Sequence, residues 1–149
     1  MTILEVWRGG DDTAESLRAD APLIDPFARA ALREPHFDFA QEAAKPWSRL
    51  WVARPQPRAA PIGFLVSWHV ADELHVLSVA VVDAARRRGI GRALMEAALD
   101  YSRSNAVRLV LIEVRRTNRA AIRLYRSLSF SAMGVRPKYY ADTGEDRCV

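Results

Sequence analysis

The sequence predicts a mixed α/β fold built on one central sheet. Two apolar runs, residues 62–70 and 74–82, are rich in β-branched and aromatic side chains and flank a short polar turn, so they predict an antiparallel hairpin. Apolar side chains then recur with helical spacing over residues 90–103. A near-continuous apolar run at residues 109–114 predicts a strand buried on both faces. Residues 74–114 therefore form a βαβ unit whose strands run parallel, which makes the sheet mixed.

The elements at the start of the chain follow from local signals. Residues 1–8 alternate in character and predict a first strand. A Gly-Gly-Asp-Asp turn then precedes a predicted short helix at residues 13–18. Asp25 and Pro26 suit the N-cap and the first position of a second helix at residues 27–33.

The remaining elements complete the sheet. Residues 36–46 favour no single structure, whereas residues 48–54 predict a strand that leads into a proline-rich loop. Asn118 is placed to cap a helix with one apolar face. Short strands are predicted at residues 130–133 and after Tyr140.

Length and composition favour one domain over residues 1–149, because half of the 149 residues are hydrophobic and can form a substantial core. The single cysteine, Cys148, excludes a disulfide within the chain and a thiolate metal cluster. The three histidines, His36, His69 and His75, have no metal-ligand spacing, so no metal is expected. Residues 1–10 do not resemble a signal peptide, and no stretch approaches the roughly 20 apolar residues of a membrane span. We therefore expect a cytoplasmic protein without membrane contact.

The formal net charge of +4 comes mainly from arginines, which are densest between residues 86 and 126. This distribution favours an anionic partner. A basic nucleic-acid-binding module is one alternative. No recognised nucleic-acid motif accompanies the arginines, so specific nucleic-acid binding is not expected.

The segment from Arg86 to Leu94 lies between a predicted strand and a predicted helix and reads Arg-Arg-Arg-Gly-Ile-Gly-Arg-Ala-Leu. Its glycines let backbone N–H groups turn toward one anion, and the helix start adds partial positive charge, so it predicts a phosphate-binding loop. An ordinary basic turn is the alternative. The segment lacks the Gly-Lys-Ser/Thr of nucleotide triphosphatases. A dinucleotide-binding turn also remains open, although Leu94 fills the third glycine position of that motif.

Three polar residues after this segment are candidates for chemistry. Glu113 interrupts an apolar strand, where an ionised carboxylate is costly unless it is paired or functional, and an ion pair with Arg115 is the alternative. Asn118 is either a simple helix cap or a ligand contact. Tyr125 lies on the apolar face of its helix, and its hydroxyl needs a partner. No Gly-x-Ser-x-Gly elbow is present, and Cys148 lies too near the chain end to suggest a well-supported nucleophile.

Together these motifs resemble the GNAT superfamily of N-acetyltransferases. The resemblance covers about residues 62–146, and within the superfamily it is nearest to ribosomal-protein-alanine N-acetyltransferase-like proteins. Its motifs are Val79-Ala80-Val81, the Arg-x-x-Gly-x-Gly turn at 86–91, Leu-Ile-Glu-Val-Arg at 111–115, Asn118, Leu124-Tyr125-x-x-Leu128-x-Phe130 and Tyr139-Tyr140.

The resemblance implies a splayed sheet with helices on both faces and acetyl-CoA held in the gap between the strands at 74–82 and 109–114. It implies that Glu113 acts as general base and Tyr125 as general acid, and that Tyr139 and Tyr140 contribute to the acceptor groove. The implied cofactor-binding residues are Val79, Ala80, Val81, Arg86, Arg87, Arg88, Gly89, Ile90, Gly91, Arg92, Asn118 and Tyr125.

The expected activity is transfer of an acetyl group from acetyl-CoA to a protein or peptide N-terminal amine, by direct attack in a ternary complex. A small-molecule amine or a lysine side chain is the alternative acceptor, and a nucleotide-binding or non-catalytic CoA-sensing module is a remoter one. Whether the protein is a monomer or a homodimer is left open. The chain departs from the family pattern at Ser129, where glycine is usual, and at Arg147, where a small residue is usual.

Overall fold

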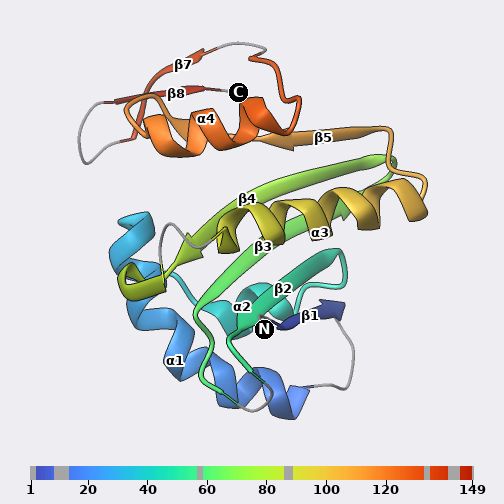
Figure 1. Ribbon diagram of the computed structural model, residues 1–149, viewed down its shortest axis with the longest axis vertical. Coiled ribbons are helices and arrows are strands. Elements are labelled where there is room, and N and C mark those ends of the chain that lie inside the picture. Colours follow the sequence, from blue (N-terminus) through green and yellow to red (C-terminus); the bar gives the residue numbers. More distant parts are fainter. Residues whose placement is uncertain are drawn as a thin grey trace. The chain divides into compact units, whose positions relative to one another are not determined.

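The computed structural model describes residues 3–8, 14–56, 59–85, 89–132, 135–140 and 145–148, with side chains described within 19–56, 59–82, 84–85 and 89–132. The chain divides into two compact units, Met1–Val110 and Leu111–Val149. In the first unit, a five-stranded sheet has the order β1-β2-β3-β4-β5 (Figure 1). The elements in chain order are β1 (Ile3–Arg8), α1 (Ala14–Leu32), α2 (Phe39–Ala43), β2 (Ser48–Arg54), β3 (Gly63–Val70), β4 (Glu73–Val81), a 3-10 turn (Asp83–Ala85), α3 (Ile90–Ser104) and β5 (Leu109–Ile112), whose last two residues fall in the second unit.

The hairpin predicted from the apolar pattern is confirmed. β3 and β4 pair antiparallel from Gly63 opposite Val81 to Val70 opposite Glu73. The strand predicted at 48–54 is also confirmed, and β2 pairs antiparallel with both β1 and β3. The helix predicted at 90–103 is α3.

Successive side chains of a strand point to opposite faces of the sheet, so each strand contributes side chains to two packed layers. On one face, Leu50 and Phe64 join a core with Ile24 of α1 and Phe39 of α2. The ring of Phe64 is central in this core, with the rings of Phe27, Phe37 and Phe39 at 5.8, 5.5 and 5.8 Å. Helices α1 and α2 therefore cover one face of the sheet.

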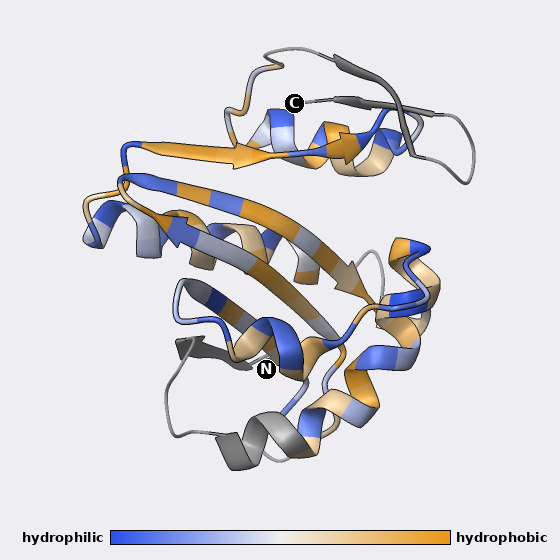
Figure 2. Cartoon of the chain, turned by 180° about the vertical axis from the view of Figure 1, so that it is seen from behind, coloured by the Kyte–Doolittle hydropathy of each residue, from blue (hydrophilic) through white to orange (hydrophobic). Residues whose placement is uncertain are grey.

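Helix α3 covers the other face (Figure 2). Leu94, Met95 and Ala98 of α3 are fully buried. Trp51, which alternates with Leu50 in β2, meets the ring of Tyr101 from α3 at 5.6 Å. Helices thus lie on both faces of the sheet, as expected.

The two short helices predicted at 13–18 and 27–33 are wrong, because α1 is continuous and contains both Pro22 and Pro26. A proline inside a helix costs about 3 kcal/mol, so its position in a sequence usually indicates a boundary. Tertiary contacts outweigh that cost here. Ile24 and Ala28, four residues apart, are fully buried against the sheet, and Asp20 forms a buried ion pair with Arg54.

Asp25 is not the N-cap of a helix at residues 27–33, because it lies inside α1. Its carboxylate accepts the N–H of Phe39 at 2.9 Å and lies 3.8 Å from Arg29, so it ties α1 to the start of α2. The segment at 36–46, for which no structure was predicted, contains α2. Asp38 caps this helix by accepting the N–H of Gln41 at 2.9 Å.

The single buried strand predicted at 109–114 is also wrong. β5 ends at Ile112, a separate strand β6 (Val114–Arg115) follows, and Glu113 lies between them. No residue of β5 is buried, and Leu109 is 42% exposed. β5 is the last strand of the sheet order, so within this sheet it has a neighbouring strand on one side only.

The second unit contains α4 (Arg119–Ser127) and a three-stranded sheet of order β6-β8-β7, in which β8 (Glu145–Cys148) pairs antiparallel with β6 and β7 (Val135–Tyr140). The predicted strand after Tyr140 is confirmed as β8. The strand predicted at 130–133 is wrong, because residues 130–132 form no strand and β7 begins at Val135.

The end of α4 explains this error. The N–H groups of Ser129 and Phe130 donate to the carbonyls of Arg126 and Tyr125, both at 3.0 Å, which forms a Schellman motif. Ser129 adopts the left-handed conformation, with φ of 73°. Phe130 therefore belongs to the helix cap, and Ser129 takes the backbone conformation of the usual glycine. In the described part of the chain, no helix has the length and hydropathy required to cross a membrane.

Candidate functional site

The segment after β4 supplies the predicted phosphate-binding loop. Arg86, Arg87 and Arg88 lie outside the described residues. Gly89 is the N-cap of α3, with φ of 75° in the left-handed region, and no side chain hydrogen-bonds to the cap. The first N–H groups of a helix have no intrahelical acceptor and carry partial positive charge. The described part of the predicted loop is therefore Gly89 and the start of α3, and anion binding there stays a prediction.

Close packing of α3 on the sheet fixes the position of the first turn of α3 within the first unit. A Cβ atom on Gly63 would lie 3.1 Å from the Ala80 carbonyl oxygen and 3.3 Å from Ile90 Cγ2. Gly63 thus lets the first turn of α3 approach β3 and β4 closely. No role was predicted for Gly63, although an isolated glycine inside a strand is a known sign of close backbone approach.

The predicted cofactor strand is the C-terminal half of β4. Ala80 is buried in the core beside Phe64, whereas Val79 and Val81 are half-buried. The register shifts between Val66 and Ser67 of β3, which leaves Leu77 as an extra residue on β4. Such a bulge changes the direction of the strand locally and is common next to active sites.

Glu113 lies in the second unit, where the chain passes from β5 to β6. The residue is half-buried, and its neighbours Ile112 and Val114 both line a pocket of about 100 Å³. The residues lining this pocket are Ile112, Val114, Ile122, Tyr125, Arg126, Phe130, Ser131 and Ala132. The structure thus brings the residues that flank Glu113 and the side chain of Tyr125 to one pocket.

Tyr125 is half-buried and packs edge to face on Phe130, with ring centroids 6.0 Å apart. Asn118 caps α4, because its Oδ1 accepts the N–H of Ala121 at 3.2 Å. The predicted helix cap is confirmed. Since Oδ1 is engaged in the cap, a cofactor contact by Asn118 would use the N–H groups of its amide.

Fewer contacts are described for the other predicted site residues. Arg92, on the first turn of α3, is 44% exposed and lies 3.7 Å from Glu96. The backbone of Tyr139 and Tyr140 belongs to β7, and their side chains lie outside the described residues. The phosphate-binding loop and β4 belong to the first unit, whereas Glu113, Asn118 and Tyr125 belong to the second.

The histidines make structural or surface contacts. His69 Nδ1 lies 2.7 Å from the Tyr101 hydroxyl, which also accepts the Nε–H of Arg49 at 3.0 Å. His75 lies 3.3 Å from Glu73. Among the described residues, no three His, Cys, Asp or Glu side chains gather as a metal site would require.

The first unit also contains a hollow of about 400 Å³ that was not predicted. It is lined mainly by polar residues at the end of α1 and the start of α2, namely Arg33, Glu34, Pro35, His36, Phe37, Asp38, Gln41 and Glu42. These residues lie mostly in the segment for which no structure was predicted, so no pattern in the sequence indicated the hollow.

Comparison with known proteins identifies the class. Residues 12–130 match the acetyltransferase (GNAT) family, and the chain belongs to this family. The match includes the loop at 86–92, Glu113, Asn118 and Tyr125. The predicted resemblance and the mixed α/β fold are therefore confirmed.

Two curated relatives are similar to part of the chain. The chain is 39% identical over 80 residues to the [ribosomal protein bS18]-alanine N-acetyltransferase of Escherichia coli K12, covering 54% of each. It is 43% identical over 74 residues to the N-alpha-acetyltransferase RimI of Mycobacterium tuberculosis, covering 50% of this chain and 45% of the relative. The matched segment thus spans about half the length of these curated relatives.

Two crystal structures of acetyltransferases are similar to this structure over more than two thirds of the chain. The ribosomal-protein-S18-alanine N-acetyltransferase from Escherichia coli superposes with a TM-score of 0.78 at 26% identity, covering 99% of this chain and 90% of that one. Nourseothricin acetyltransferase superposes with a TM-score of 0.62 at 30% identity, covering 69% and 63%.

Proposed function

We propose that residues 1–149 act as one N-acetyltransferase domain that transfers the acetyl group of acetyl-CoA to a protein or peptide N-terminal α-amine. The observation that carries this proposal is the family match over residues 12–130, which includes the candidate loop and both candidate catalytic residues. Relatives named as alanine or N-alpha-acetyltransferases support an α-amine as the acceptor.

The residues of the first unit fit the anionic part of acetyl-CoA. Gly89 has a positive φ that favours glycine, and a Cβ built at this position meets no atom within 4 Å. The chain can therefore present the start of α3, together with Arg86, Arg87, Arg88, Ile90, Gly91 and Arg92, to the pyrophosphate. Backbone groups of Val79, Ala80 and Val81 would hold the pantetheine arm, and Asn118 would donate its amide N–H to the same molecule.

The second unit supplies the proton transfers. Bound acetyl-CoA provides an acetyl group activated as a thioester. An α-amine has a pKa of about 7.7 to 8.0, so a large fraction is protonated at neutral pH and must lose a proton before it can attack. Glu113 takes this proton, directly or through water, and the amine nitrogen then forms a bond to the acetyl carbon. As the C–S bond breaks, Tyr125 delivers the proton of its hydroxyl to the departing sulfur, and the proton that the nitrogen loses in becoming an amide restores the hydroxyl of Tyr125. Direct attack requires no enzyme nucleophile.

The acceptor groove includes Tyr139 and Tyr140 in this proposal. A second candidate acceptor is a small-molecule amine, and the similarity to nourseothricin acetyltransferase favours it. The two acceptors differ in size and in the groups around the amine, so a substrate panel separates them.

The test measures thiol release from acetyl-CoA with short peptides that differ in their first residue, and with nourseothricin and polyamines. We expect turnover with peptides that begin with alanine or serine. Removing a general acid or base lowers turnover about 10²- to 10⁴-fold. Glu113→Gln and Tyr125→Phe should both show such a loss in kcat.

Two matched variants make this test specific. Tyr101→Phe removes a hydroxyl that contacts Arg49 and His69, and Glu73→Gln removes a carboxylate beside His75. Both should retain turnover within a few-fold of the native chain. Turnover of nourseothricin without turnover of any peptide would replace the α-amine acceptor, and binding of acetyl-CoA without turnover of any amine would contradict an enzymatic role.

A further inference from the structure

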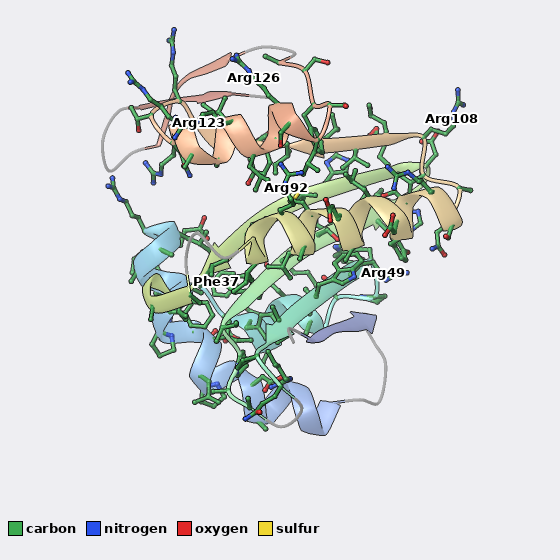
Figure 3. All side chains as sticks on the ribbon, in the orientation of Figure 1. Phe37, Arg49, Arg92, Arg108, Arg123 and Arg126 are labelled. Carbon is green, nitrogen blue, oxygen red and sulfur yellow. The ribbon has the colours of Figure 1, made fainter. Side chains whose placement is uncertain are left out.

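The pocket beside Tyr125, which we call the α4 pocket, has mainly apolar walls and lies within the second unit. The half-buried residues that line it are Ile112, Val114, Ile122, Tyr125 and Phe130. The exposed residues that line it form its solvent side, and they are Arg126, Ser131 and Ala132. Figure 3 shows the side chain of Arg126 extending from α4. The inner part of the pocket therefore suits an uncharged, apolar group.

Local structure positions these walls. Ile122 and Tyr125 are three residues apart in α4, so they lie on the same face of the helix. The cap of α4 holds Phe130 beside this face, because the Phe130 N–H donates to the Tyr125 carbonyl at 3.0 Å and the two rings are 6.0 Å apart. Much of the pocket is thus built by one helix and its cap.

The volume of the α4 pocket exceeds what an acetyl group requires. An apolar cavity of about 150 Å³ is known to hold benzene, which has six carbon atoms. In proportion, the volume of about 100 Å³ measured here has room for about four carbon atoms. An acetyl group places a single methyl group beyond its carbonyl carbon, so there is space for a longer chain.

We propose that the α4 pocket holds the acyl chain of the acyl-CoA substrate, and that the enzyme transfers propionyl and butyryl groups as well as acetyl groups. This inference rests on the proposed function, in which Tyr125 gives its proton to the departing sulfur. The acyl carbonyl carbon is bonded to that sulfur, so the rest of the chain begins two bonds from the atom that Tyr125 protonates. Glu113, which takes the proton of the amine, is not among the lining residues. The amine therefore does not have to share the pocket with the chain.

The reaction is the same for a longer chain. The amine nitrogen forms a bond to the acyl carbonyl carbon, and the C–S bond breaks. The sulfur gains one proton and the nitrogen loses one, so the products are an amide and the thiol of CoA. Chain length thus affects only how the acyl-CoA binds and is positioned.

The first experiment measures binding without transfer. CoA thioethers that carry ethyl, propyl, butyl or octyl chains have no acyl group to donate, and their affinities are measured by isothermal titration calorimetry. Each methylene buried in an apolar site raises affinity about four-fold. We expect a rise of up to about 16-fold from ethyl to butyl and no further rise for octyl, whose chain is longer than the pocket.

The second experiment narrows the pocket and measures transfer. Ala132→Leu adds three carbon atoms at a lining residue, and the matched control Ala120→Leu makes the same change at an exposed residue of α4 that does not line the pocket. Peptide products formed from acetyl-CoA and butyryl-CoA are quantified by mass spectrometry. Ala132→Leu should lower the ratio of kcat/KM for butyryl-CoA to that for acetyl-CoA about ten-fold, and Ala120→Leu should leave this ratio within two-fold. The ratio is measured in one preparation, so a loss of folded protein does not change it.

Several outcomes would overturn the proposal. Equal affinity for the ethyl and butyl thioethers would mean that the chain lies elsewhere, and a rise that continues to octyl would indicate an open apolar surface. An equal fall with acetyl-CoA and butyryl-CoA in Ala132→Leu would assign the pocket to the pantetheine arm or the acceptor. A preference for succinyl-CoA over butyryl-CoA would assign it to a charged chain paired with Arg126.

Failure of this inference is distinct from failure of the proposed function. Turnover of acetyl-CoA without any effect of chain length would contradict the inference alone. The absence of turnover with every acyl-CoA would contradict the proposed function and the transfer of longer chains, whereas the thioether affinities alone decide whether the α4 pocket holds the chain.

Discussion

Helices α3 and α4 each follow a strand and carry candidate site residues, but they are stabilised differently. α3 buries Ile90, Leu94, Met95, Ala98 and Ser102, and no side chain caps its start. None of the nine described residues of α4 is buried, and the side chain of Asn118 caps its start. Packing stabilises α3, whereas α4 depends more on its local caps.

The largest expected difference between the two helices is in the stability lost when a leucine side chain is shortened to alanine. Leu94 has no exposed surface, and Leu→Ala at such a site costs about 2 to 5 kcal/mol. Leu94→Ala should therefore lower the free energy of unfolding by this amount in urea denaturation. The matched change Leu124→Ala, at a half-buried residue of α4, should cost less than half as much. Equal losses would contradict the claim that packing stabilises α3 more than α4.

The next effect tests how closely α3 approaches the sheet. Gly63→Ala places a methyl group 3.1 Å from the Ala80 carbonyl oxygen, a backbone atom that cannot move without shifting β4. Overpacking of this kind costs about 1 to 3 kcal/mol. Thermal denaturation should show the loss, and KM for acetyl-CoA should rise because Val79, Ala80 and Val81 shift. An unchanged KM together with lowered stability would separate Gly63 from cofactor binding.

The parts of this fold that the sequence predicts well are those in which a local pattern decides the structure. Two apolar runs around a polar turn indicate the β3–β4 hairpin, a period of 3.6 indicates α3, and both were predicted within one or two residues. The continuous α1 was not predicted, because Pro22 and Pro26 are local signals for a boundary. The contacts that override them, Ile24 with the sheet and Asp20 with Arg54, join residues far apart in the chain.

The features of the candidate site likewise fall into those that local sequence predicts and those that depend on tertiary packing. The helix cap predicted at Asn118 is confirmed, and Gly89 has the left-handed backbone that favours glycine, while its role in anion binding stays a prediction. The pocket beside Tyr125 and the close approach at Gly63 depend on tertiary packing, which no local pattern encodes. The catalytic roles of Glu113 and Tyr125 stay predictions until the kinetic test is made.

A smaller effect is expected at the start of α4. Asn118→Ala removes the side-chain acceptor for the Ala121 N–H and should cost about 1 kcal/mol, measured by thermal denaturation. Asn118→Asp keeps an oxygen acceptor and should retain stability, but it lacks the amide N–H groups proposed to contact acetyl-CoA. A raised KM in Asn118→Asp with unchanged stability would separate the two roles. An unchanged KM would restrict Asn118 to capping.

The smallest effect is expected at the helix ends, where a non-glycine residue has a positive φ in both helices. Ser129 has φ of 73° after α4, and Ala106 has φ of 57° after α3, where the Val107 N–H donates to the Ser102 carbonyl at 3.2 Å. The left-handed conformation costs an L-residue about 1 to 2 kcal/mol, whereas glycine loses about 0.5 to 1 kcal/mol through unfolded-state entropy. Ser129→Gly and Ala106→Gly should each raise the free energy of unfolding by about 0.5 to 1 kcal/mol. Because α4 depends more on its ends, Ser129→Gly should give the larger gain in thermal denaturation, and a larger gain at Ala106 would contradict the contrast between the two helices.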